Sequence, residues 1–234
     1  LEWLIELEID AFKIGSGERG NFSFLKKIAE RKKPIILSTG MCDASDVDES
    51  IKILEKNGCE DLALLHCVTA YPTPQRDVNL RSISFFQEKY QFPIGYSDHT
   101  PSPTACIAAV ALGACIIERH ITLDYDIPNA QDWRVSSGPD DFADFVYEMQ
   151  ATFDMMGKSE KKRRGSELSA EKWAIKRIVT TRNIYSGNVL LASDLQSKRA
   201  GFGITSDNLD NVIGRRLVRD VQADFPICEE DLGS

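Results

Sequence analysis

Short, unbroken apolar runs recur along the first half of the chain, and amphipathic segments separate them. The runs begin about 20 to 30 residues apart, at 12–14, 34–38, 62–66, 93–97 and 114–118. Buried parallel strands read as continuous apolar runs, and parallel strands need helical crossovers between them. The pattern therefore predicts an α/β domain with a parallel sheet covered by helices.

Helical periodicity fills the intervals between these runs. Segment 21–31 places Phe22, Leu25 and Ile28 on one face, segment 44–57 repeats the pattern, and 104–112 is rich in small residues. Five strands are too few for an eight-stranded barrel. We expect either a barrel with about three βα units upstream of residue 1, or an open five-stranded sheet.

The pattern changes after residue 157. Residues 158–172 are polar and include the basic run 161–164, which predicts a solvated linker. Residues 173–234 contain short β-like segments separated by turns. We therefore predict a partial α/β domain at 1–157, a linker at 158–172 and a small, mostly β module at 173–234.

Charge and cysteine content exclude some classes of protein. The net charge is −8, and the acidic excess lies in the first domain, which argues against a nucleic-acid partner. No apolar run is long enough to span a membrane, and no signal peptide is recognisable, so we expect a cytoplasmic protein without membrane contact. None of the six cysteines forms a CxxC pair, which favours reduced thiols.

All three histidines of the chain stand at predicted carboxyl ends of strands. Ligand chemistry gathers at these ends in parallel α/β folds. His99 and His120 follow neighbouring strands, and two imidazoles so placed can share a divalent ion such as Mn, Fe, Co or Zn. His66 fits a hydrogen-bonded core residue better. Asp98 either orients a metal ligand or caps the next helix.

Lys13 interrupts an apolar strand. It is either a snorkelling or salt-bridged lysine, an anchor for phosphate or carboxylate, or a Schiff-base nucleophile. Hydroxyl groups stand at further strand ends, namely Ser16, Ser38, Thr39 and Ser97. Each of them alone would be an ordinary helix cap, but together with a lysine they suit a small phosphorylated anion.

Six motifs occur in an order that resembles one enzyme family. They are FKIGSGE, PIILSTGM, LLHCVTAYPTP, DVNLRSI, IGYSDHT and IIERHITLD. With the tail motifs KRAGFGI and NVIGRRLVRDV, the chain resembles the sialic acid synthases and their legionaminate, pseudaminate and spore-coat relatives. The resemblance covers nearly all of the chain. It implies part of a TIM barrel, a (β/α)8 fold, followed by an antifreeze-like (SAF) domain.

The resemblance also implies a reaction. Family members are transferases that join phosphoenolpyruvate to an N-acylated hexosamine, N-acetylmannosamine or a diacetamido-hexose, and release phosphate. A divalent metal assists, with Mn²⁺ expected first and Mg²⁺ or Co²⁺ as alternatives. The implied assembly is a homodimer in which the C-terminal domain covers the barrel of the partner.

Site residues follow by matching motifs. His99 and His120 resemble the metal ligands of the family, and Lys13 and Glu118 are the candidate catalytic residues. The candidate substrate-binding residues are Lys13, Ser16, Ser38, Thr69, Tyr71, Ser97, Asp140 and Arg199.

Three departures from the family pattern bear on function. Thr69 replaces the asparagine of sialic acid synthases and resembles the legionaminate and pseudaminate branches. The loop 124–137 is longer than usual where the acceptor sugar would bind, which affects acceptor identity. The upstream strands of the family, which supply a catalytic glutamate, precede Leu1, so a cellular chain beginning at Leu1 is expected to have little activity.

Two other functions fit parts of the sequence. A Schiff-base aldolase would use Lys13 as its nucleophile, and metal chelators would not change its activity. A non-catalytic carbohydrate-binding protein would bind sugar through the β module, but it would not need two clustered imidazoles.

Overall fold

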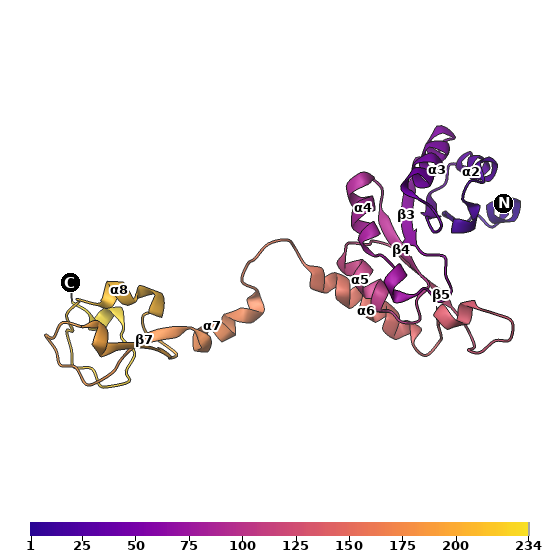
Figure 1. Ribbon diagram of the computed structural model, residues 1–234. Coiled ribbons are helices and arrows are strands. Elements are labelled where there is room, and N and C mark those ends of the chain that lie inside the picture. The colour runs from indigo at the N-terminus through magenta and orange to yellow at the C-terminus, as the bar shows by residue number, and fades with distance from the viewer. Residues whose placement is uncertain (234) are drawn as a thin grey trace. The chain divides into compact units, whose positions relative to one another are not determined.

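The computed structural model describes residues 1–233 and divides into two compact units (Figure 1). The first unit comprises Leu1–Lys158, and the second begins at Ser159. Most of the segment predicted as a linker therefore belongs to the second unit, where it contains a 3₁₀ turn and most of helix α7 (Leu168–Ala174). No helix within residues 1–233 is long and apolar enough to cross a membrane.

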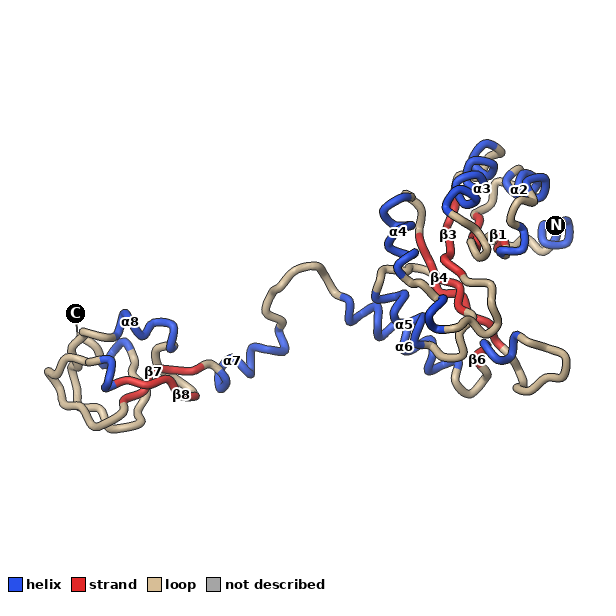
Figure 2. Tube along the Cα trace, viewed as in Figure 1, coloured by secondary structure: helices blue, strands red, loops and turns tan. Residues whose placement is uncertain are grey.

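A curled sheet of parallel strands forms the centre of the first unit (Figure 2). The strands are β1 (Phe12–Ile14), β2 (Ile35–Ser38), β3 (Leu62–Cys67), β4 (Ile94–Asp98), β5 (Ile117–Ile121) and β6 (Ser136–Ser137). They pair strictly in chain order. This sequential order is the arrangement of a TIM barrel, so the predicted partial barrel is confirmed.

The sequence predicted five strands, and the structure has six. The sixth, β6, has two residues, both serines, and pairs with His120 and Ile121 of β5. So short a polar segment carries no periodicity and escapes a search for apolar runs.

Helices follow the strands and cover the sheet on its outer face. They are α1 (Glu2–Glu6), α2 (Phe22–Ala29), α3 (Ala44–Lys56), α4 (Arg81–Lys89), α5 (Thr104–Ala111) and α6 (Phe142–Met156). The predicted helices 21–31, 44–57 and 104–112 are confirmed as α2, α3 and α5. Their apolar faces bury Leu25, Ile28, Val47, Ile51 and Leu54 against the sheet.

The second unit has less regular structure than the sequence predicted. Strands β7 (Lys176–Thr180) and β8 (Leu195–Arg199) pair antiparallel, and a short helix α8 (Leu209–Val212) follows. The other β-like segments contribute only isolated bridges, such as Ile184 with Val221. A separate core closes this unit, with Ile178, Leu190 and Ile227 fully buried. It is a module of turns and bridges rather than of long strands.

A buried ion pair joins the ends of β4 and β5. The carboxylate of Asp98 accepts hydrogen bonds from the guanidinium of Arg119, from the Tyr96 hydroxyl at 3.0 Å and from the backbone N–H of Thr100 at 2.9 Å. The two charged side chains are 0% and 4% exposed. Because a buried charge without a partner is strongly unfavourable, this pair holds the turn after β4 against β5.

We expect the substitution Arg119→Met to lower the free energy of unfolding of the first unit by about 3–5 kcal/mol, because it leaves the Asp98 carboxylate buried without its cation. The measurement is urea unfolding followed by circular dichroism. As a control, Lys89→Met breaks the more exposed pair with Asp48 and should cost under about 1 kcal/mol. Equal costs for the two variants would show that the buried pair does not stabilise the fold.

Candidate active site

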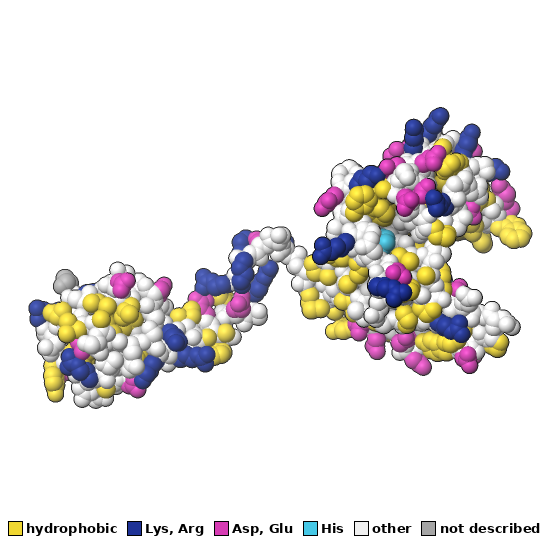
Figure 3. Space-filling view, in the orientation of Figure 1, with side chains coloured by type: hydrophobic (Ala, Val, Ile, Leu, Met, Phe, Trp, Pro, Cys, Tyr) yellow, Lys and Arg dark blue, Asp and Glu magenta, His cyan; other side chains and the backbone are white. Residues whose placement is uncertain are grey.

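The predicted site residues of the first unit come from the carboxyl ends of its strands. Lys13 lies on β1 and Ser38 ends β2, while Ser97 and Glu118 face each other across β4 and β5. Figure 3 shows this unit with a hollowed face, where a histidine is visible close to acidic and basic side chains. The topology therefore gathers residues that are far apart in the chain at one edge of the sheet.

Glu118 connects two of the predicted substrate-binding residues. One of its carboxylate oxygens lies 3.2 Å from Nζ of Lys13 and accepts a hydrogen bond of 2.7 Å from the Ser97 hydroxyl. The Lys13 ammonium also donates to the carbonyl of Ile14 at 3.3 Å. This network fixes a cation and a hydroxyl side by side, which is a suitable arrangement for an anionic substrate.

Ser38 is a predicted contact whose buried hydroxyl is unsatisfied. Its side chain is buried, and its Oγ has no hydrogen-bond partner within residues 1–233. A buried hydroxyl without a partner costs free energy, so such groups usually indicate a ligand or an ordered water.

Ser16 packs closely against the turn after β2. The backbone N–H of Gly40 donates to Oγ of Ser16 at 2.9 Å. A Cβ atom at position 40 would lie 2.2 Å from Oγ1 of Thr69 and 2.7 Å from Oγ of Ser16. Only glycine allows this approach, which brings Ser16 and Thr69 together.

His99 has the tautomer that a metal ligand needs. Its Nδ1 lies 2.7 Å from the carbonyl oxygen of Val68, which can only accept, so Nδ1 carries the proton. In the neutral ring, Nε2 then presents a lone pair, which accepts a hydrogen bond of 2.8 Å from the Tyr71 hydroxyl. The rings of Tyr71 and His99 stack with centroids 4.0 Å apart.

His120 lies next to His99, with ring centroids 5.3 Å apart. Burial lowers the pKa of His120, and the neighbouring His99 lowers it further, so the ring is neutral near pH 7. The carboxylate of Asp132 lies 3.7 Å from Nδ1 of His120. Two adjacent imidazoles with a carboxylate beside one of them are the kind of arrangement that forms an open metal site.

The acidic residue beside the imidazoles is one that motif matching did not name. Asp140 is exposed and stands in the turn before α6, without a contact to the imidazole pair among the described residues. Asp132, in the 3₁₀ turn Asp132–Val135 of the long loop, is the carboxylate beside His120. The contact of Asp140 with the acceptor sugar stays a prediction, and the only sequence signal of Asp132 was its place in the long loop.

Asp98 answers a question that the sequence left open. Its carboxylate points to the outer face of the sheet, toward Arg119 and Tyr96, and neither orients a metal ligand nor caps α5. His66 is likewise directed outward and donates to the carbonyl of Val78, as predicted for a hydrogen-bonded core histidine.

Arg199 ends β8 in the second unit. Its guanidinium carbon lies 5.7 Å from the centre of the Trp173 ring. The two units are described separately, so its role toward the first unit stays a prediction.

The residues present fit a metal bound through few protein ligands. Within residues 1–233 no group of three or more His, Cys, Asp or Glu side chains is placed to hold a metal. The pair His99 and His120 offers two nitrogen ligands, and the remaining positions would be open to water or substrate.

Both units of the chain resemble known proteins. A model of the SAF domain matches residues 164–233. The chain is 35% identical to N,N'-diacetyllegionaminic acid synthase of Campylobacter jejuni, over 98% of this chain and 69% of that protein. It is 34% identical to N-acetylneuraminate-9-phosphate synthase of Homo sapiens, over 98% of this chain and 64% of that protein. The chain thus spans about two thirds of the length of these relatives.

A solved structure shows the same likeness. The N-acetylneuraminic acid synthetase of Leptospira borgpetersenii, in complex with citrate, superposes with a TM-score of 0.66 at 34% identity. The match covers 72% of this chain and 59% of that one. The model of the NeuB family matches residues 1–161, well over half of the sequence, and the chain therefore belongs to the NeuB family.

Proposed function

We propose that this protein condenses phosphoenolpyruvate with an N-acylated hexosamine to give a nonulosonic, sialic-type acid and phosphate. C3 of phosphoenolpyruvate forms the new C–C bond with the aldehyde carbon of the open-chain sugar. Water adds to C2, and the bond between C2 and the bridging oxygen breaks as phosphate leaves. Relatives named as legionaminic, sialic and pseudaminic acid synthases support this reaction class.

The observation that carries the proposal is the unsatisfied hydroxyl of Ser38 at the same sheet edge as Lys13 and Ser97. An ammonium group and several hydroxyls directed at one place stabilise a small, highly charged anion. Phosphoenolpyruvate carries both a phosphate and a carboxylate, so it offers hydrogen-bond acceptors to the ammonium group and to the hydroxyls. In this proposal Glu118 is a positioning residue, because it acts through Lys13 and Ser97.

His99 and His120 would hold the metal, for which we propose Mn²⁺. When bound there, the metal acts as a Lewis acid toward the aldehyde oxygen and orients the reacting water. The carbonyl of Val68 accepts a hydrogen bond from Nδ1 of His99, which directs Nε2 toward the site, where the Tyr71 hydroxyl contacts it. Asp132 stands where it can fix the ring of His120 or contact the acceptor sugar.

A Schiff-base mechanism at Lys13 has less support. Schiff-base formation needs a free amine that can reach the carbonyl of a substrate, whereas Nζ of Lys13 is already engaged by the Glu118 carboxylate at 3.2 Å. No other observation favours an aldolase or a non-catalytic sugar-binding protein.

The assembly and cellular place belong to the same proposal. We propose a cytoplasmic homodimer in which Arg199 of one subunit reaches the acceptor in the barrel of the other. All six cysteines are free thiols, which fits a reducing compartment.

Phosphate release tests the reaction directly. Protein expressed with any upstream coding sequence is incubated with phosphoenolpyruvate and either N-acetylmannosamine or a diacetamido-hexose. We expect release that requires one acceptor, stops with EDTA and returns with Mn²⁺, because the imidazole pair would hold the metal. Release from none of the acceptors, by a folded and metal-loaded protein, would contradict the proposal.

The unsatisfied Ser38 hydroxyl predicts that its removal weakens the binding of phosphoenolpyruvate but stabilises the fold without substrate. We expect Ser38→Ala to raise the KM for phosphoenolpyruvate about ten- to hundredfold, the range for losing a hydrogen bond to a charged group. The same change should raise the free energy of unfolding without substrate by about 1 kcal/mol, because it removes a buried, unpaired group. Steady-state kinetics and urea unfolding provide the two measurements.

Ser50→Ala is the matched control, since its buried hydroxyl already donates to the Asp46 carbonyl at 2.8 Å. It should leave the KM unchanged. A Ser38→Ala protein with a wild-type KM would exclude the Ser38 hydroxyl from substrate binding.

The role of Arg199 is tested through the acceptor sugar. We expect Arg199→Ala to raise the KM for the acceptor at least tenfold and to leave that for phosphoenolpyruvate unchanged, because the arginine would contact only the sugar. Lys198→Ala, which removes the neighbouring exposed charge paired with Asp224, is the control. Similar acceptor KM values for both variants would show that Arg199 does not contact the acceptor sugar.

A further inference from the structure

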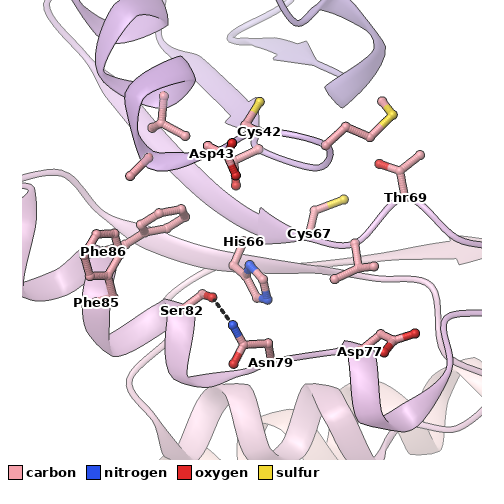
Figure 4. A pocket seen from close by; sticks show the side chains of 15 residues that line it. Cys42, Asp43, His66, Cys67, Thr69, Asp77, Asn79, Ser82, Phe85 and Phe86 are labelled. Atoms are coloured by element: carbon pink, nitrogen blue, oxygen red, sulfur yellow. Dashed lines mark hydrogen bonds between the residues drawn. The ribbon is translucent and has the colours of Figure 1, made fainter.

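A second cavity lies on the outer side of β3, between the loop that precedes α3 and the start of α4 (Figure 4). Its volume is about 470 Å³, within the range of small-molecule sites of roughly 300–1,000 Å³. His66 is part of its lining and points away from the candidate active site, because successive side chains of a strand face opposite sides. The two sites share a wall at Thr69 and at Cys67, whose Sγ lies 3.6 Å from Oγ of Ser16.

His66 gives this cavity a hydrogen-bond acceptor. The side chain is only 7% exposed, and its Nε2 lies 2.7 Å from the carbonyl oxygen of Val78, to which it must donate. Burial lowers the pKa of His66, so the ring is neutral and its Nδ1 is an acceptor. Within the described residues Nδ1 has no hydrogen-bond partner, and a donor on a ligand would satisfy it.

The charged groups of the cavity are acidic. Asp43 and Asp77 both line it, and no lysine or arginine is among its described lining residues. Arg76 approaches Asp77 to 3.7 Å, but its side chain is 86% exposed, so solvent screens this pair. Such a cavity repels phosphorylated or carboxylated anions and favours a cation.

One wall of the cavity is aromatic. Phe86 is buried, Phe85 is about half exposed, and their ring centres are 5.9 Å apart. Figure 4 shows these rings on one side of the cavity and Asp43 and Asp77 away from them. Aromatic faces suit the C–H face of a sugar ring or an ammonium group.

We propose that this cavity binds a protonated amino sugar, a small polyol that carries an ammonium group. Its ammonium would face Asp43 and Asp77, a hydroxyl would donate to Nδ1 of His66, and its C–H face would lie against Phe85. The site is additional to the proposed condensation site and takes a ligand of the opposite charge to phosphoenolpyruvate.

The test is calorimetric titration of the protein with glucosamine, in EDTA and without phosphoenolpyruvate. We expect binding of one molecule, and an affinity at least tenfold weaker for glucose and for N-acetylglucosamine, which lack the charge. Asp77→Asn should weaken glucosamine binding at least fivefold. Glu88→Gln, which removes an exposed charge of α4 outside the cavity, should have no effect.

Any of the following results would overturn the proposal. They are no glucosamine binding by the folded protein at millimolar glucosamine in at least 10-fold molar excess over the protein, equal affinities for glucosamine and glucose, and equal effects of Asp77→Asn and Glu88→Gln. Glucosamine binding must also persist in His99→Gln, since loss there would assign it to the metal pair. Because the titration needs neither metal nor phosphoenolpyruvate, its result is independent of whether the protein is a synthase.

Discussion

The parallel register of β4 with β5 is the constraint on which the site depends. It sets Ser97 opposite Glu118 and Asp98 opposite Arg119, and the next residues, His99 and His120, have ring centres 5.3 Å apart. Because side chains alternate between the faces of a sheet, the first and third of these pairs face inward and the second faces outward. A slip of one residue would exchange the faces and destroy both the site and the ion pair.

The outward pair stabilises the turn that carries the inward ones. Asp98 and Arg119 are almost fully buried and satisfy each other, together with the Tyr96 hydroxyl and the Thr100 backbone. The strand ends therefore stay in place although they present polar groups to a cavity. The hydrogen bonding of the inward-facing groups is less complete, since the Ser38 hydroxyl has no partner among the described residues. The buried ion pair on the outer face of the sheet thus holds in place the strand ends that carry the candidate site residues on the inner face.

The two faces of β3 show the same division. Cys67 faces inward, close to Ser16 and His99, whereas His66 faces outward among Phe86 and Tyr96. The outward histidine is held by one nitrogen, and its other nitrogen has no hydrogen-bond partner among the described residues.

The sequence by itself determined the fold class, the positions of the longer strands and helices, and the residues that stand at strand ends. Apolar runs and helical periodicity depend only on local geometry, and the motifs FKIGSGE and IGYSDHT locate Lys13, Ser16, Ser97 and His99 without reference to distant contacts. Only the tertiary structure decided which acidic group accompanies the imidazoles. It places Asp132 beside His120, because the course of a long loop follows from packing and not from a periodic pattern. The strand β6, the outward role of Asp98 and the link between Lys13 and Ser97 through Glu118 are also consequences of register, which pairs residues that are distant in the chain.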